Sequence, residues 1–412
     1  MCGIVGICNF INQPNNDMVK IMNKKLHHRG PDDEGYFNNK YISFGHKRLS
    51  ILDIENSKQP MVDQTNGNVL IFNGEIYNFN QIRTELKNIG YKFFTNGDTE
   101  VVLNAYKKWG IDCLKKFEGM FAFAIWDNVK KHLFIARDKF GEKPFFYTFS
   151  KKYGFLFSSE IKSFLGVNEI KKDLKIDYSS LNIYLSLNYL IADKTFFKNV
   201  YSLEPSNYMI INQSNYQNTK PEKYWFLEKY FINKSKDNYN ASTKKLDEVI
   251  KNSIKHRTIS DVSNGTFLSG GIDSSIISLQ LKNIDNHKMS AHNLSFKEKN
   301  FDEYNDAKIV ASHFGIDLKK YNIPVSENLV KDFPKIIEAM DQPMSDTSFI
   351  ATYYLSKYSS KNSKMVLSGD GADEVFAGYN TYQADWIKRF LPKILFKHLN
   401  YLIDFFKFFK NS

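Results

Sequence analysis

Two stretches in the second half of the chain repeat one pattern, in which an apolar strand runs into a glycine-rich turn and then into a helix. They are FLSGGIDSS at 267–275 and LSGDGADE at 367–374. Strand-like KMSAHNLSF (288–296) and helix-like NDAKIVASHFGI (305–316) lie between them. This alternation predicts a parallel sheet covered by helices on both faces, with its sites at the carboxyl ends of the strands.

The first half has a different pattern, made of aromatic and β-branched runs bounded by Gly, Asn and Asp. Two amphipathic helices interrupt the runs, at 80–90 and 98–110. This predicts a strand-rich α+β domain. Since 412 residues exceed what one hydrophobic core usually supports, we expect one domain over 1–211, a polar connection over 212–240 and a second domain over 241–412.

Composition excludes several classes of protein. Three cysteines give no disulfide framework, which favours a reducing compartment and a cytoplasmic protein. The N-terminus lacks a signal-peptide pattern, and no apolar run is long enough to span a bilayer. The formal net charge of +11 comes from scattered lysines. We therefore expect no nucleic-acid partner, although a positive field would attract an anionic substrate.

The first residues, MCGIVGI, put a cysteine directly after the initiator Met1. Removal of Met1 would make Cys2 the N-terminal residue, with a thiol nucleophile and an α-amine that can act as its base. The alternative is an accidental early cysteine at the start of a buried strand. Cys8 and Cys113 are expected to be ordinary core residues.

Both glycine turns carry groups suited to a nucleotide. In the first, Gly270 and Gly271 would let the backbone approach a phosphate, while a helix begins at Asp273. The second turn adds Asp370 and Asp373, and two carboxylates with phosphate oxygens suit Mg²⁺. The alternative is a pair of ordinary turns with helix caps. A third polar loop, DQPMSDTS at 341–348, is expected either to line the same crevice or to be a plain turn.

Seven motifs, in this order, resemble the glutamine-hydrolysing asparagine synthetase family. They are MCGIVGI, HHRGPDDEG, HKRLSILD, NGEIYN, GDTE, LSGGIDSS and LSGDGADEVFAGY. The resemblance runs from Met1 to about Tyr379. It implies an N-terminal-nucleophile hydrolase fold, which is an αββα sandwich, for the glutaminase domain. It implies a Rossmann-like ATP-pyrophosphatase domain for the rest.

For the glutaminase, the resemblance implies that Cys2 is the nucleophile. Asn73 and the N–H group of Gly74 would form the hole for the oxyanion. Three further residues would bind glutamine: the guanidinium of Arg48 would hold its α-carboxylate, and the carboxylates of Glu75 and Asp98 would hold its α-amine.

For the second domain, the resemblance implies that ATP adenylates a carboxylate and that ammonia then displaces AMP. The residues implied for ATP binding are Ser269, Gly270, Gly271, Asp273, Ser274, Ser275, Ser368 and Gly369. Asp273 and Asp373 would bind Mg²⁺, and Asp370 and Tyr379 would lie at the acceptor. The implied partners are glutamine, ATP and aspartate or another carboxylate, with a homodimer as one possible assembly and an apolar ammonia tunnel between the domains.

The chain departs from the family pattern in three places. Asp370 stands where many members have Glu, Ala377 replaces a common Gly, and members normally continue beyond residue 412, into a part that carries a lysine used in adenylation. We therefore expect an incomplete synthetase domain. The alternatives are amidation of another carboxylate, such as a sugar acid of a surface polysaccharide, or a truncated chain that only hydrolyses glutamine or binds partners.

The last residues, 389–412, have the spacing of an amphipathic helix. Its apolar positions are Leu395, Leu399, Leu402, Phe406 and Phe409. Three placements stay open: inside the synthetase domain, on a face left bare, or on a membrane surface. A bare face would favour self-association and a chain that makes little asparagine.

Overall fold

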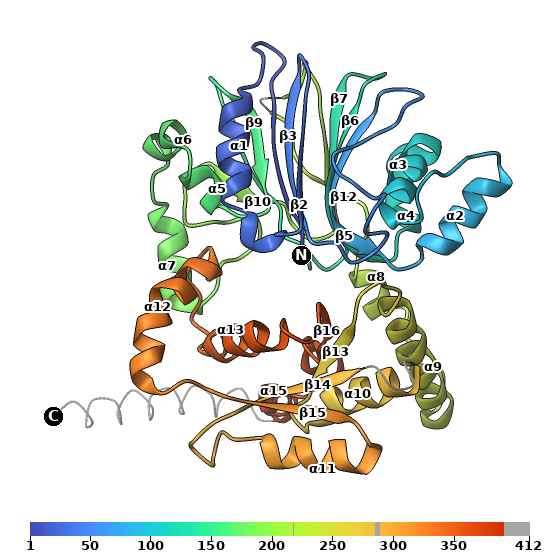
Figure 1. Cartoon of the computed structure of the whole chain (residues 1–412), viewed down its shortest axis with the longest axis vertical. Helices are drawn as coiled ribbons and strands as arrows, with labels where there is room; N and C mark the ends of the chain where they lie inside the picture. The colour runs from blue at the N-terminus through green and yellow to red at the C-terminus, as the bar shows by residue number, and fades with distance from the viewer. Residues whose placement is uncertain (217, 285–288, 391–412) are drawn as a thin grey trace.

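The computed structural model describes residues 1–216, 218–284 and 289–390. Its two halves lie one above the other, a sheet-rich first half and a second half built around one smaller sheet (Figure 1). The strand-rich pattern of the first half and the strand–helix alternation of the second are therefore both confirmed. The amphipathic helix predicted near the C-terminus falls mainly in residues 391–412, outside the described residues.

The first half contains two six-stranded antiparallel sheets. One has the order β10-β8-β9-β1-β3-β2 and the other β12-β11-β7-β6-β5-β4. The strands of the first sheet are β1 (Gly3–Cys8), β2 (Asp33–Asn38), β3 (Ile42–Arg48), β8 (Phe146–Ser150), β9 (Gly154–Ser158) and β10 (Val200–Ser202). Those of the second are β4 (Met61–Val62), β5 (Val69–Ile76), β6 (Gly119–Asp127), β7 (His132–Arg137), β11 (Asn207–Ile211) and β12 (Glu222–Lys223).

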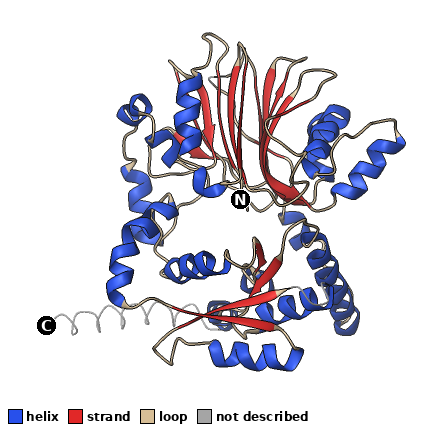
Figure 2. Ribbon diagram, in the orientation of Figure 1, coloured by secondary structure: helices blue, strands red, loops and turns tan. Residues whose placement is uncertain are grey.

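The two sheets pack face to face with helices outside them, as Figure 2 shows. Alternation along each strand makes this arrangement possible. In β1, Ile4 and Cys8 enter the core between the sheets, whereas Val5 and Ile7 pack under α1. The first sheet is covered by α1 (Asn16–Lys24), α5 (Lys162–Leu165) and α6 (Asn168–Asp173), and the second by α2 (Phe79–Asn88), α3 (Asp98–Trp109) and α4 (Cys113–Lys116). This is the expected αββα sandwich.

The second half is an α/β layer structure around a parallel sheet of order β15-β14-β13-β16. Its strands are β13 (Asn264–Phe267), β14 (Ser290–Ser295), β15 (Asp317–Asn322) and β16 (Met365–Leu367). One face packs on α9 (Tyr239–Arg257), α10 (Ile272–Ile284) and α11 (Tyr304–Phe314), and the other on α12 (Ser326–Met340) and α13 (Ser348–Ser359). The expected parallel sheet with helices on both faces is confirmed.

Shorter elements complete the chain. They are η1 (His27–Arg29), η2 (Gly110–Asp112), α7 (Tyr178–Leu187), α8 (Glu228–Ile232), α14 (Ala372–Phe376) and α15 (Asn380–Lys388). The short strand β12 pairs with β11 although it lies beyond residue 211. The division at 211 and 240 stays a prediction. Among the described residues, no helix is both long enough and apolar enough to cross a bilayer.

Candidate functional site

The first candidate site is a cavity of about 350 Å³ at one end of the sandwich. The six residues proposed for glutamine chemistry all line it: Cys2, Arg48, Asn73, Gly74, Glu75 and Asp98. Strand alternation explains why four of them meet. Along β1 and β3, Cys2 and Arg48 stand at the alternate positions that face the space between the two sheets. Asn73 and Glu75 stand at such positions along β5. The two facing sheets therefore supply opposite walls of one pocket.

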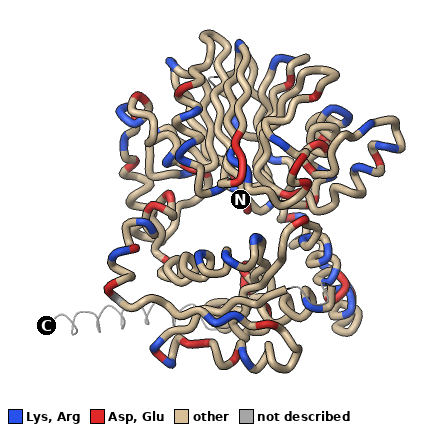
Figure 3. Tube along the Cα trace, in the orientation of Figure 1, with Lys and Arg blue, Asp and Glu red and all other residues tan. Residues whose placement is uncertain are grey.

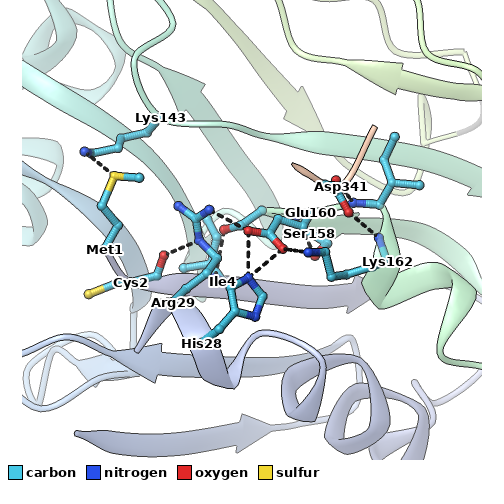
Figure 4. Close-up of polar contacts among 12 residues, drawn as sticks. Met1, Cys2, Ile4, His28, Arg29, Lys143, Ser158, Glu160, Lys162 and Asp341 are labelled. Atoms are coloured by element: carbon cyan, nitrogen blue, oxygen red, sulfur yellow. Dashed lines mark hydrogen bonds and ion pairs between the residues drawn. The ribbon is translucent and has the colours of Figure 1, made fainter. Parts of the chain in front are cut away.

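Cys2 is half-buried at the start of β1. The N–H of Leu49 donates to Cys2 Sγ at 3.4 Å, and Arg29 Nε donates to the Cys2 carbonyl at 2.9 Å (Figure 4). Burial raises the pKa of the Cys2 thiol, so a nearby base is needed to activate it. Cys8 and Cys113 are fully buried core residues, as expected.

The α-amine beside this thiol belongs to Met1, which also lines the cavity. Burial lowers the pKa of this amine to about 5, so it is uncharged at neutral pH and can accept a proton. Lys143 Nζ donates to Met1 Sδ at 2.9 Å (Figure 4). Removal of Met1 would transfer the amine to Cys2 itself.

Asn73 is only 1% exposed, and neither its amide nitrogen nor its amide oxygen has a hydrogen-bond partner in the described part of the chain. A buried amide left unpaired costs stability, and this one lines the cavity, where a ligand can pair with it. The adjacent Gly74 lies so close to β6 that a Cβ would overlap the Met120 carbonyl oxygen and Phe121. Glycine at this position therefore keeps β5 and β6 together beside the cavity.

Two carboxylates lie on the same side of the cavity. Burial, and after it the charge of Asp98, raises the pKa of Glu75 to about 7. Burial also raises the pKa of Asp98 to about 6, although Asp98 Oδ2 accepts a hydrogen bond from the Ile76 N–H at 2.9 Å. Two buried carboxylates form a site for a cation, and the ammonium group of an amino acid meets this requirement.

Arg48 is 5% exposed, and its guanidinium is already engaged by a loop. Nη1 donates to the Ile54 carbonyl at 2.7 Å, and Nη2 donates to the Asp53 carbonyl at 2.8 Å. An incoming carboxylate would therefore share Arg48 with this loop. The loop itself is docked on the second half, because the Asp53 N–H donates to Asp261 Oδ2 at 2.7 Å.

The second candidate site is a cavity of about 520 Å³ at the carboxyl ends of β13 and β16. Both glycine turns reach it. The proposed residues that line it are Ser269, Gly271, Asp273, Ser274, Ser368, Gly369, Asp370 and Asp373. A Cβ on Gly369 would lie 3.2 Å from Asp273 Cβ, so the two turns are in direct contact.

Three of the proposed residues are not among those lining this cavity. Gly270 has φ +94, and a Cβ there would meet the backbone of Asp306, so it is needed for packing against α11. Ser275 Oγ is buried without a partner in the described chain, and the hydroxyl of Tyr379 donates to Glu374 Oε1 at 3.0 Å. Residues 341–348 are also not among the lining residues, and α13 contributes Ala351, Thr352 and Leu355.

The donor set of the second cavity fits Mg²⁺ held together with a nucleotide. Asp273 and Asp373 come from the two different turns and line the same space. Within the described residues, no group of three or more His, Cys, Asp or Glu side chains forms a metal cluster. The remaining ligands would therefore be phosphate oxygens and water, which Mg²⁺ commonly uses.

Sequence reasoning missed several lining residues of the first cavity. Lys143, in GEKP, is 4% exposed, and burial lowers the pKa of its ammonium group. Lys364, Met365 and Val366 come from the second half of the chain and have no local signal for this role. Residues 364–366 line the first cavity and residues 368–370 line the second. The strand β16 and the residues that flank it therefore contact both cavities.

Charged residues of both signs occur throughout the part of the chain that the structure describes. Lysine and arginine segments are spread over both halves and interleave with acidic ones (Figure 3). This distribution agrees with the scattered lysines of the sequence.

Comparison with known proteins assigns both halves to described families. A family model for a glutamine amidotransferase domain matches residues 1–225, and one for asparagine synthase matches residues 245–409. The glutamine-hydrolysing asparagine synthetase 1 of Bacillus subtilis is 36% identical over 391 residues, which are 93% of this chain and 60% of that protein. This chain thus spans about three-fifths of that relative's length.

A Methanocaldococcus jannaschii relative whose name assigns it to the same class is 36% identical over 423 residues, covering 96% of this chain and 79% of that protein. Among solved structures, the glutamine phosphoribosylpyrophosphate amidotransferase of Bacillus subtilis matches 77% of this chain and 65% of its own, with 16% identity and a TM-score of 0.41. From the match over residues 1–225 and the coverage of the archaeal relative, the chain belongs to the glutamine-hydrolysing asparagine synthetase family.

Proposed function

We propose that this chain transfers the amide nitrogen of glutamine to aspartate, with the consumption of ATP, and so makes asparagine. The observation that carries the proposal is the first cavity, where Cys2, an unpaired buried amide at Asn73 and the Glu75–Asp98 carboxylate pair face one another. The family membership supports the same reaction. The Bacillus subtilis relative is longer than this chain, and the activity of the whole enzyme is part of what we propose.

In the first half-reaction, Cys2 Sγ attacks the side-chain carbonyl carbon of glutamine. The thiol proton goes to the adjacent α-amine, which the removal of Met1 would place on Cys2. The oxyanion accepts hydrogen bonds from the side-chain amide of Asn73 and the N–H of Gly74, each worth about 3 kcal/mol in such sites. The α-ammonium then gives the proton to the amide nitrogen, the C–N bond breaks and ammonia leaves. Water hydrolyses the resulting thioester to glutamate and restores the thiol.

In the second half-reaction, a carboxylate oxygen of aspartate attacks the α-phosphorus of ATP and pyrophosphate leaves. Ammonia attacks the resulting acyl-adenylate and AMP leaves. The backbone and hydroxyls of 269–275 and 368–369 would hold the nucleotide, and Asp370 and Tyr379 would face the acceptor. Mg²⁺, held by Asp273 and Asp373, would offset the negative charge that develops on the phosphates. The cysteine chemistry requires a reducing compartment, and we infer the cytoplasm.

The first test concerns Cys2. Cys2→Ala should abolish the release of glutamate from glutamine, because the nucleophile is gone, whereas synthesis from added ammonium salts should survive. Cys113→Ala is the matched control, since Cys113 is a fully buried thiol outside the cavity. Glutamate release by Cys2→Ala at the rate of the parent chain would reject the assignment.

The second test identifies the acceptor and the bond cleaved in ATP. The chain is incubated with glutamine, ATP and Mg²⁺, and with either aspartate or a panel of sugar acids. AMP, pyrophosphate and the amide product are measured. AMP formation that depends on aspartate supports the proposal, dependence on a sugar acid moves the acceptor to that class, and ADP with phosphate rejects adenylation.

A further inference from the structure

The loop 341–348 is not among the residues lining the nucleotide cavity, yet its first residue makes a defined contact elsewhere. Asp341 ends α12 and reaches across to the first half of the chain. Its Oδ2 accepts the N–H of Ile161 at 2.7 Å and its Oδ1 accepts the N–H of Lys162 at 2.8 Å (Figure 4). Lys162 Nζ also donates to the Glu338 carbonyl at 2.5 Å. One carboxylate therefore holds two successive amides of the other domain.

Glu160, the residue before these two amides, is a buried carboxylate to which the proposed glutaminase reaction gives no direct role. Glu160 Oε1 lies 2.7 Å from Arg29 Nη1, and Glu160 Oε2 lies 3.1 Å from Lys162 Nζ. Burial alone would raise the pKa of Glu160, but hydrogen bonding to His28 and the charge of Arg29 bring it down to about 2. Glu160 is therefore ionised and paired throughout the working pH range.

Arg29 continues this chain of contacts to the nucleophile. Its Nε donates to the Cys2 carbonyl at 2.9 Å, while its Nη1 is held by Glu160. The side chains of Arg29 and Glu160 are 9% and 8% exposed, so water does not loosen the pair. A second connection runs beside it, because the Ile4 N–H donates to Ser159 Oγ at 3.0 Å. The segment 159–162 thus supports the start of β1 from two sides.

The backbone of Asp341 indicates that this contact is maintained at a cost. Asp341 has φ +63, a conformation that glycine adopts much more readily. Strain of this kind persists where the surrounding contacts require the side chain. Asp341 is half-buried, and this burial raises the pKa of its carboxyl group while the hydrogen bonds from the two amides oppose the shift.

We propose that Asp341, from the second domain, is a positioning residue of the glutaminase reaction, acting through the 161–162 amides, Glu160 and Arg29 on the main chain of Cys2. This inference rests on the proposed glutaminase activity. Its consequence is that nucleophile geometry in the first domain depends on how α12 of the second domain is docked. The glutamine-binding groups Arg48, Glu75 and Asp98 are not part of this chain of contacts.

The test compares Asp341→Gly with Asp341→Asn and a matched control, Glu338→Gln. Glycine removes the carboxylate and also suits the positive φ, so the fold is not strained further. Asparagine keeps one acceptor oxygen. Glu338 is an exposed carboxylate on the same helix, three residues earlier, and only its carbonyl contacts Lys162. Each variant is assayed for kcat and KM of glutamine hydrolysis, for the rate of Cys2 alkylation by iodoacetamide, and for thermal stability.

We expect Asp341→Gly to lower kcat by about 10- to 100-fold, the usual effect of misplacing a reacting group by about 1 Å, with KM for glutamine changed less than twofold. Asp341→Asn should fall between Asp341→Gly and the parent, and the alkylation rate should change in the same order. A kcat for Asp341→Gly within twofold of Glu338→Gln would overturn the inference. So would a parallel change in kcat, KM and melting temperature, which is the mark of a purely structural role.

Failure of the proposed function gives a different result. A parent chain that releases no glutamate would reject the glutaminase activity, and the inference with it. An active parent with unaffected Asp341 variants would reject the inference alone.

Discussion

At the scale of single residues, the first cavity contains groups that weaken the fold in the absence of a ligand. Asn73 has a buried amide without a partner in the described chain, and Glu75 and Asp98 are neighbouring buried carboxylates. Each is unfavourable for stability alone. Each becomes favourable when an oxyanion or an ammonium group enters. Stability is therefore given up at the positions where the substrate would bind.

Asn73→Ala tests this relation between stability and activity. The variant should lose about 10²- to 10³-fold in kcat for glutamine hydrolysis, the usual effect of removing one oxyanion donor, with little change in KM. Its unfolding midpoint should fall little, because the Asn73 side chain makes no hydrogen bond within the described residues. Steady-state kinetics and urea denaturation measure the two quantities. A large rise in KM at unchanged kcat would place Asn73 in substrate binding instead.

The titration of Glu75 should make both the free energy of unfolding and the KM for glutamine depend on pH. Its pKa is raised from 4.5 to about 7 in the folded chain, so the folded state binds the extra proton, and the free energy of unfolding falls as pH rises from about 4.5 to 7. The upper limit of this contribution is ~3 kcal/mol. In the proposed reaction the ionised form of Glu75 binds the glutamine α-amine, so KM should rise about tenfold from pH 8 to pH 6.

Glu75→Gln is the variant that checks both effects of Glu75. It should flatten the pH dependence of KM, raise KM at pH 8, and make the chain more stable than the parent at that pH. Kinetics and chemical denaturation at several pH values measure this. A parent whose KM is constant from pH 6 to 8 would contradict the role of Glu75.

At the scale of elements, β16 has an unusual position. Lys364, Met365 and Val366 line the first cavity, and Ser368 and Gly369 line the second. Lys364 Nζ also lies 2.6 Å from Asp32 Oδ2, which accepts the Ser50 N–H beside Leu49. Both ionic partners are about one-third exposed, so this pair contributes at most ~1 kcal/mol to stability. The main consequence of this placement is therefore that β16 and its flanking residues connect the two cavities, and the ion pair adds little to stability.

At the scale of the whole molecule, the two halves differ in the size of their cores. The first half has three large apolar clusters, between and outside its two sheets. The described part of the second half has two smaller clusters, one on each face of its sheet. Because burial of apolar surface is the main stabilising contribution, the second half should unfold first.

Two spectroscopic signals can separate the halves. Trp126 is fully buried in the first half, Trp109 also lies there, and Trp225 packs on Phe140 of that half, whereas Trp386 is 61% exposed. Tryptophan fluorescence therefore reports mainly the first half, while far-UV circular dichroism includes the long helices of the second. In urea, the dichroism midpoint should come at the lower concentration. Coincident midpoints would mean that the contacts between the domains make the chain unfold as one unit.

The sequence alone determined which elements form and what chemistry they carry. Aromatic and β-branched runs predicted the strands of the first half, the glycine turns at 270 and 371 predicted strand-to-helix junctions, and Cys2 was singled out by its position after Met1. These signals are local, because turn geometry and side-chain period depend on neighbours in the chain.

Only the tertiary structure decided which distant residues meet. Lys364, Met365 and Val366 line the same cavity as Cys2. Gly270 packs on α11. Asp341 does not line the nucleotide cavity and instead accepts hydrogen bonds from amides of the other domain. None of these placements has a local signal. Contacts between residues that are far apart in sequence depend on how whole sheets and domains pack, and that packing is set by buried surface summed over many residues.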